Sequence, residues 1–243
     1  KFRRIKSIFT IHNIEYQGKF DPYILGDVFA LADEDRAVVE YDGCINLMKG
    51  AIECAEAVTT VSPRYADEIM SPEYSHGLYH ILRANAGKVS GILNGIDYSY
   101  YNPWTDPVLV KHYSAKRRGG KDACRSALRA DLNLADDKGT PVIALITRLA
   151  AHKGLDIVAE AMRGILDESG AQLVVLGKGE ARYEEFFRQL EAEYPDRVRA
   201  LITYDRDLSK KIYAAADIFM MPSKSEPCGL SQMIASRYGA IPV

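Results

Sequence analysis

The sequence predicts an α/β protein whose later part forms a doubly wound parallel sheet. From about position 140 onward, short apolar runs alternate with segments in which apolar residues recur at helical spacing. Strands and helices alternate in this way in a parallel sheet. With 243 residues, of which 47% are hydrophobic and 26% charged, the chain can bury one large or two modest domains. No low-complexity segment interrupts the pattern.

The first 93 residues contain a mixture of shorter elements. Apolar spacing predicts strands at 6–11, 58–61 and 89–93, and helices at 22–31, 45–57, 63–70 and 78–84. Ser62 as the N-cap and Pro63 at the first helical position give a strong start signal for one of these helices. The turn at 94–97 is a candidate junction between two domains.

After this junction, the residues from 98 to 120 are rich in Tyr, Pro, Trp and basic side chains, as suits a loop that wraps between lobes. The expected strands are 141–147, 172–176, 198–203 and 218–221, and the expected helices are 121–131, 154–167, a helix ending at 193, 208–215 and 232–238. A further strand begins at 239–243, and the chain opens directly before a strand. We therefore expect both ends to continue in a longer protein.

Charge and cysteine content exclude several classes of protein. The formal net charge of −2 gives no electrostatic case for nucleic acid or an anionic membrane as partner. The four cysteines form no CxxC pair and the chain shows no signal peptide, so we expect free thiols and a cytoplasmic, soluble protein. His76 and His80 lie four apart, but Gly77 follows the first, so the HExxH zinc motif fails and no metal site is expected.

A basic loop follows the predicted strand at 141–147. Arg148 and Lys153 place two cations between a strand end and a helix N-terminus. Arginine can bind two phosphate oxygens at once, lysine acts as a point charge, and helix amides add to both, so the loop suits a diphosphate. The alternative is a solvated basic loop, since neither a Walker loop nor a GxGxxG fingerprint is present.

The loop at 223–231 follows the predicted strand at 218–221 and precedes a helix, so Glu226 would lie in the crevice where open α/β sheets bind ligands. Gly177 and Tyr204 also follow strands; each has an ordinary alternative, a turn glycine and an exposed loop tyrosine. His12 just past the first strand is placed for a cleft or for a local backbone contact. Cys228 lies near a helix start, but no histidine is fixed beside it as a nucleophile's base.

Five motifs in order resemble those of one enzyme family. They are TIHNIEYQG at 10–18, TVSP at 60–63, LNGID at 93–97, TRL to KG at 147–154, and EPCGL at 226–230. The chain resembles the bacterial glycogen synthases and plant starch synthases over essentially its whole length. These are retaining transferases of glycosyltransferase family 5 with the GT-B fold, which has two Rossmann-like domains. The resemblance implies that residues 1–93 are the later part of the acceptor-side domain, and that residues 94–243 are most of the donor-nucleotide domain.

The activity implied by the resemblance is glycogen biosynthesis. Glucose would pass from ADP-glucose to the non-reducing 4-OH of an α-1,4-glucan such as glycogen, with retention and without a metal ion or other cofactor. Arg148 and Lys153 match the pair that holds the donor diphosphate, Glu226 matches the carboxylate near the donor sugar, and His12 matches the histidine that reaches toward the glucose. The further matches are sugar contacts at Asn94 and Gly95, an adenine neighbour at Tyr204, and amides of Cys228, Gly229 and Leu230 that bind glucose and phosphate.

Two further sequence features refine this assignment. The transferases of family 4 carry a second glutamate eight positions after the first, where this chain has Ile234, which favours family 5. The Lys-Thr-Gly-Gly-Leu segment that the family uses at its donor and acceptor site is absent, so about half of a complete enzyme is expected in this sequence. The alternatives are a retaining family 4 transferase and a non-catalytic fragment that binds nucleotide or glucan.

Overall fold

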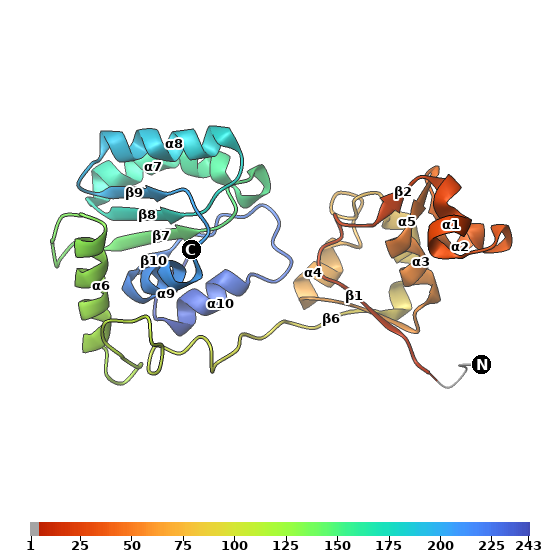
Figure 1. Cartoon of the computed structure of the whole chain (residues 1–243), viewed down its shortest axis with the longest axis horizontal. Coiled ribbons are helices and arrows are strands. Elements are labelled where there is room, and N and C mark those ends of the chain that lie inside the picture. Colours follow the sequence, from red (N-terminus) through yellow and green to blue (C-terminus); the bar gives the residue numbers. More distant parts are fainter. Residues whose placement is uncertain (1–4) are drawn as a thin grey trace. The chain divides into compact units, whose positions relative to one another are not determined.

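The computed structural model describes residues 5–243, and these divide into two compact units, one ending at Asn94 and one running from Gly95 to Val243 (Figure 1). None of the helices in this part of the chain has the length and apolar character that a membrane span requires. Each unit is built around its own parallel sheet.

The first unit contains a three-stranded parallel sheet in the order β1-β5-β6. Its strands are β1 (Ile8–Ile11), β5 (Ala57–Thr60) and β6 (Val89–Gly91), and its longer helices are α3 (Leu47–Cys54), α4 (Pro63–Glu68) and α5 (Tyr79–Ala84). The Ser62 hydroxyl oxygen accepts a hydrogen bond from the Tyr65 N–H at 3.0 Å, which caps α4. The helix start predicted from Ser62 and Pro63 is therefore confirmed.

A small antiparallel sheet in this unit was not predicted. It consists of β2 (Lys19–Phe20), β4 (Cys44–Asn46) and β3 (Glu40–Tyr41), in that order. The predicted helix at 45–57 was wrong at its start, because Ile45 pairs with Phe20 in the sheet and the Asn46 side chain caps α3 instead. Two- and three-residue strands are too short for alternation to reveal them in a sequence.

The segment at 22–40 is more broken than the helix predicted at 22–31. A 3₁₀ turn (Pro22–Ile24) leads into the five-residue helix α1 (Leu25–Phe29), and a second 3₁₀ turn (Asp33–Asp35) leads into α2 (Arg36–Val39). Helix α1 ends because Ala30 has a φ of 52°, in the left-handed region that cannot continue a helix. Another 3₁₀ turn (Ala86–Lys88) precedes β6.

The second unit is a five-stranded parallel sheet in the order β11-β10-β7-β8-β9. Its strands are β7 (Val142–Ile146), β8 (Gln172–Leu176), β9 (Val198–Leu201), β10 (Ile218–Phe219) and β11 (Ile241–Pro242). Its helices are α6 (Gly119–Asp131), α7 (Leu155–Ser169), α8 (Ala181–Glu193), α9 (Arg206–Ala215) and α10 (Leu230–Arg237). The predicted class, α/β with parallel sheets, is confirmed.

Helices cover both faces of this sheet, which makes it doubly wound (Figure 1). Helices α7 and α8 pack on one face, and α6, α9 and α10 pack on the other. Along β7, the side chains of Ile143 and Leu145 belong to the hydrophobic core under α7 and α8. Those of Val142 and Ala144 belong to the core on the opposite face, under α6, α9 and α10. Because both sets are buried, the strand is a continuous apolar run, which is the pattern that made it visible in the sequence.

The strand order reverses between β7 and β10, and this point places the loops that matter for function. From β7 the chain builds outward through β8 and β9, then returns to the other side of β7 as β10. In open α/β sheets the crevice at such a reversal, beyond the carboxyl ends of the strands, is where ligands bind. The loop after β7 and the loop after β10 flank that crevice.

Candidate functional site

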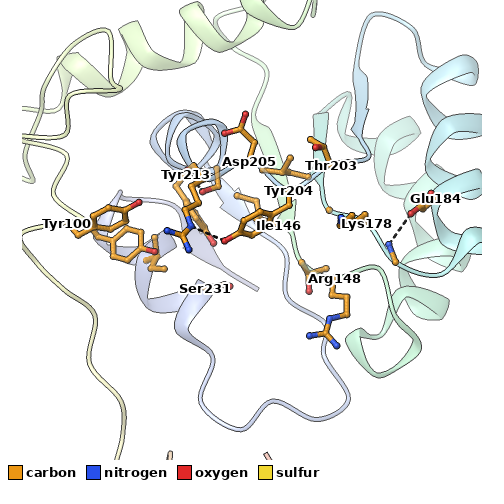
Figure 2. A pocket seen from close by; sticks show the side chains of 18 residues that line it. Tyr100, Ile146, Arg148, Lys178, Glu184, Thr203, Tyr204, Asp205, Tyr213 and Ser231 are labelled. Carbon is orange, nitrogen blue, oxygen red and sulfur yellow. Dashed lines mark hydrogen bonds between the residues drawn. The ribbon is translucent and has the colours of Figure 1, made fainter. Parts of the chain in front are cut away.

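A cavity of about 990 Å³ opens at the carboxyl ends of β7, β8 and β9 within the second unit (Figure 2). Three of the residues predicted from the sequence line it together, namely Arg148, Gly177 and Tyr204. They follow three different strands, so the sheet is what assembles them. The cavity is large enough for a ligand the size of a nucleoside diphosphate or a nucleotide sugar.

Gly177 allows the loop after β8 to lie against the loop after β7. A Cβ atom at this position would stand 1.9 Å from the backbone oxygen of Thr147, which no real side chain tolerates. The two loops are further joined by a hydrogen bond from the Leu149 N–H to the Lys178 oxygen at 3.0 Å. The glycine is thus required for close packing of the cavity floor, whatever ligand the cavity holds.

Arg148 lies two residues beyond the end of β7, with an exposed side chain that lines the cavity. Figure 2 shows it on one side of the cavity, with Lys178 nearby in the loop after β8. Both side chains are cationic and both follow strand ends. This side of the cavity therefore suits an anionic group such as a diphosphate.

Lys153 and Glu226 form an ion pair at the strand reversal. The Lys153 Nζ lies 2.6 Å from a Glu226 carboxylate oxygen, and the side chains are 19% and 26% exposed. The same oxygen accepts a hydrogen bond from the Ser223 hydroxyl at 3.0 Å. The structure thus joins two residues that the sequence separates by 73 positions, although neither is among the residues that line the cavity.

Backbone packing brings the loops of this ion pair together. Gly154 has a φ of 69°, and a Cβ there would stand 1.9 Å from the Pro222 backbone oxygen. The Lys224 N–H donates a hydrogen bond to the His152 oxygen at 3.0 Å, and the Lys224 ammonium pairs with Asp156. The loop after β7 and the loop after β10 are therefore held against each other by backbone contacts.

Helix α10 begins directly after the second of these loops. Gly229 is its N-cap, with a φ of 79°, and Leu230 is its first residue. Ser231 and Ile234, farther along the helix, line the cavity. The predicted contacts at Cys228, Gly229 and Leu230 therefore lie at a helix start next to the cavity lining, where backbone amides are available to an anion.

The other side of the cavity is aromatic. Tyr204 is 70% exposed, and its hydroxyl accepts a hydrogen bond from the Arg206 Nε at 3.1 Å. Tyr100 and Tyr101, whose rings meet edge to face with centroids 4.8 Å apart, also line the cavity. Burial raises the pKa of the neighbouring Tyr213 to about 12, so its hydroxyl stays protonated at neutral pH. Such a surface suits a planar ring system, which stacks on aromatic side chains.

Several lining residues were missed from the sequence. They are Tyr100, Tyr101, Ile146, Glu184, Thr203, Asp205, Arg206, Ser209, Tyr213, Ser231 and Ile234. The loop and helix residues after β9 could have been predicted from the sequence, because they are close to Tyr204 in the chain and follow the same strand. Tyr100 and Tyr101 gave no signal beyond the tyrosine content of their loop.

Besides the residues described above, three further predicted site residues do not line this cavity. His12 is exposed and directly follows β1, as expected, but it belongs to the first unit. Asn94 and Gly95 stand on either side of the boundary between the units, and the Asn94 N–H donates to the Val61 oxygen at 3.3 Å. Their predicted contacts with the donor sugar stay predictions.

Within residues 5–243, no group of three or more His, Cys, Asp or Glu side chains is arranged to hold a metal ion. Cys228 is partly buried, and all four cysteines are free thiols. What the site offers chemically is cationic side chains, helix amides and one carboxylate held on a lysine. These groups can bind a phosphorylated ligand and stabilise negative charge that develops on a departing phosphate.

Comparison with known proteins identifies the family of this chain. A family model described as the starch synthase catalytic domain matches residues 1–84, and one described as glycosyl transferases group 1 matches residues 129–243. The chain is 46% identical over 244 aligned residues to a glycogen synthase of Streptococcus agalactiae serotype Ia, covering 100% of this chain and 51% of the relative. A glycogen synthase of Ligilactobacillus salivarius is 45% identical, with the same coverage.

A solved structure agrees with these relatives. The catalytic domain of starch synthase IV from Arabidopsis thaliana, bound to ADP and acarbose, superposes with a TM-score of 0.89 at 41% identity, covering 98% of this chain and 50% of that one. The chain thus spans about half the length of the curated relatives that it matches. On this agreement of sequence and fold, the chain belongs to the glycogen and starch synthase family, with the GT-B fold of that family.

Proposed function

We propose that this chain supplies the donor site of a glycogen synthase, which transfers glucose from ADP-glucose to the non-reducing 4-OH of an α-1,4-glucan with retention at the anomeric carbon. The observation that carries the proposal is the cavity at the ends of β7, β8 and β9. It has Arg148 and Lys178 on one side and tyrosines on the other, which suits a nucleoside diphosphate. The relatives named glycogen synthase and the ADP-bound starch synthase structure support the same donor.

In this proposal the diphosphate lies beside Arg148, the nucleobase lies beside Tyr204, and Lys153 turns from Glu226 toward the departing phosphate. Negative charge grows on the leaving ADP as the glucosyl bond breaks, and fixed cations lower the energy of that transition state. Glu226, once released, orients hydroxyl groups of the donor glucose and stabilises positive charge at the anomeric carbon. His12 would reach the transferred glucose from the first unit.

Retention needs an explanation other than the paired carboxylates of a retaining glycosidase. Such enzymes place two carboxyl groups about 5 Å apart, with one acting as the nucleophile. In the described part of the second unit, Glu226 is instead held by a lysine and a serine. The proposal is therefore attack by the acceptor on the face from which ADP departs, with the departing phosphate accepting the acceptor's proton.

Transfer of radiolabelled glucose from ADP-glucose to glycogen, measured beside a calorimetric titration with ADP, tests this function. Transfer that is saturable in ADP-glucose supports the proposal. Binding of ADP without transfer would favour the alternative of a module that only binds nucleotide. Transfer from UDP-glucose or GDP-mannose but not from ADP-glucose would favour a family 4 enzyme.

A further inference from the structure

Arg206 occupies a position in the cavity that the proposed chemistry does not use. It is the first residue of α9 and is exposed, and its Nε donates a hydrogen bond to the Tyr204 hydroxyl at 3.1 Å. Arg206 and Tyr204 both line the cavity, on the aromatic side with Tyr100 and Tyr101. The Arg206 guanidinium thus lies near the phenol groups of these tyrosines, on the aromatic side of the cavity.

The backbone around Arg206 is fixed, so the side chain of Arg206 starts from a defined position. Asp205 is the N-cap of α9, and its carboxylate accepts a hydrogen bond from the Leu208 N–H at 2.9 Å. The opposite end of the helix is buried, with Ile212 and Tyr213 in the core against the sheet. Because the helix is anchored in this way, its first side chain can hold a more mobile neighbour.

Tyr204 is such a neighbour. It lies in the loop between β9 and α9, and its side chain is 70% exposed, so packing alone does not select one orientation of the ring. Among residues 5–243, the one hydrogen-bond partner of the Tyr204 hydroxyl is Arg206. A ring that is held before the ligand arrives loses less entropy when a base stacks on it.

We propose that Arg206 is a positioning residue that holds the Tyr204 ring in place as the platform for the donor's nucleobase. The inference rests on the proposed function, because it assumes that a nucleoside diphosphate is the ligand of this cavity. It assigns to Arg206 no contact with the phosphates, which the cations on the other side of the cavity would bind. The hydrogen bond to the phenol is what transmits its effect.

Calorimetric titrations of the whole chain with ADP and with inorganic pyrophosphate test the assignment. The variants are Arg206→Ala, Tyr204→Phe, which keeps the ring but loses the hydroxyl, and the double variant. Lys211→Ala is the matched control, since it removes a cation from the same helix at a residue that does not line this cavity. Circular dichroism confirms that each variant is folded.

Each single variant should raise the Kd for ADP by about three- to tenfold, as the loss of one hydrogen bond predicts. The double variant should be no weaker than either single one, because both remove the same interaction. The Kd for pyrophosphate, which has no base, should not change in any variant, and Lys211→Ala should bind ADP as the wild type does.

Three results would overturn the assignment. Unchanged ADP affinity in Arg206→Ala would remove any role for this residue. Weaker pyrophosphate binding in Arg206→Ala would show that it acts on phosphate by charge. Weak ADP binding in Arg206→Ala with normal binding in Tyr204→Phe would show that it contacts the ligand directly. A wild-type chain that binds no ADP would instead reject the proposed function, and the inference with it.

Discussion

Two ion pairs hold the loop after β10, one to the loop after β7 and one to the first turn of α7, and they differ in burial. In the pair of Lys153 with Glu226, the side chains are 19% and 26% exposed, whereas in the pair of Lys224 with Asp156 both are 51% exposed. The first pair has an additional hydrogen bond from Ser223. The Lys224 ammonium is the first cause that holds the pKa of Asp156 below its ordinary value.

Burial distinguishes which of the two ion pairs can take part in function. An exposed pair is screened by water and salt, so breaking it has little consequence. A partly buried pair leaves an uncompensated charge when one partner is removed, unless a ligand supplies a replacement. A phosphate is a suitable replacement partner for Lys153. In the proposed function, the pair of Lys153 with Glu226 therefore takes part in donor binding, whereas the exposed pair has a structural role.

Breaking the buried pair should have the largest effect. Lys153→Ala, like Arg148→Ala, should lower glucose transfer by about a hundredfold or more, because a preorganised cation at the leaving group is lost.

Glu226→Gln should lower transfer while leaving ADP affinity intact, since Lys153 is then released for phosphate. The radiolabel assay and an ADP titration separate these effects; transfer at wild-type rates in Lys153→Ala would refute the role of the buried pair.

Backbone contact, rather than either ion pair, should determine whether the two loops dock. Gly154→Ala places a Cβ against the Pro222 oxygen and should lower the free energy of unfolding by about 1–3 kcal/mol. Gly164→Ala, within α7 and facing open space, is the control and should raise it by about 0.5–1 kcal/mol. Urea unfolding measures both, and equal stability of the two variants would contradict the close approach.

A third lysine, Lys121, is buried more deeply than Lys153 and Lys224. Lys121 donates hydrogen bonds to the Ala214 and Tyr238 oxygens, at 3.1 and 3.0 Å, and burial lowers its pKa to about 8. Between pH 8 and the ordinary lysine pKa, the unfolded chain therefore binds more protons than the folded one. Stability contributed by this group must rise with pH in that window.

The expected size of this pH effect is a gain of roughly 1.5 kcal/mol for the wild type relative to Lys121→Met between pH 8 and 9.5. Comparing the two proteins reduces the contribution of Cys124, whose pKa is raised by burial and whose effect on stability runs in the opposite direction. Urea unfolding at several pH values measures the difference. Parallel pH profiles would show that Lys121 keeps an ordinary pKa.

The smallest effect should come from the exposed pair. Lys224→Ala should leave Tm within about 2 °C of the wild type, because a solvated pair adds little stability. High salt should abolish even that difference. A large loss of stability in Lys224→Ala would mean that exposure does not distinguish the two pairs, and the comparison would fail.

The second unit was the more predictable one. Strands β7 and β8 are buried on both faces, so their apolar runs were visible, and β8 was predicted with its observed bounds. The first unit contains strands of two and three residues, and Ile45 was wrongly assigned to a helix because a short apolar run fits either periodicity. The structure of Ile45 is determined by its pairing with Phe20 in the small sheet and not by the local apolar pattern.

Sequence patterns alone were sufficient to predict the α/β class, the cap at Ser62, the family resemblance, and the residue types of the proposed donor site. Each depends on neighbours within a few positions or on motifs that can be read locally. The folded structure was needed to show that Lys153 pairs with Glu226, that Tyr100 and Tyr204 share a cavity, and that Arg206 donates a hydrogen bond to the Tyr204 hydroxyl. The strand order of the sheet brings these residues together, and strand order depends on packing between distant segments, which no local pattern encodes.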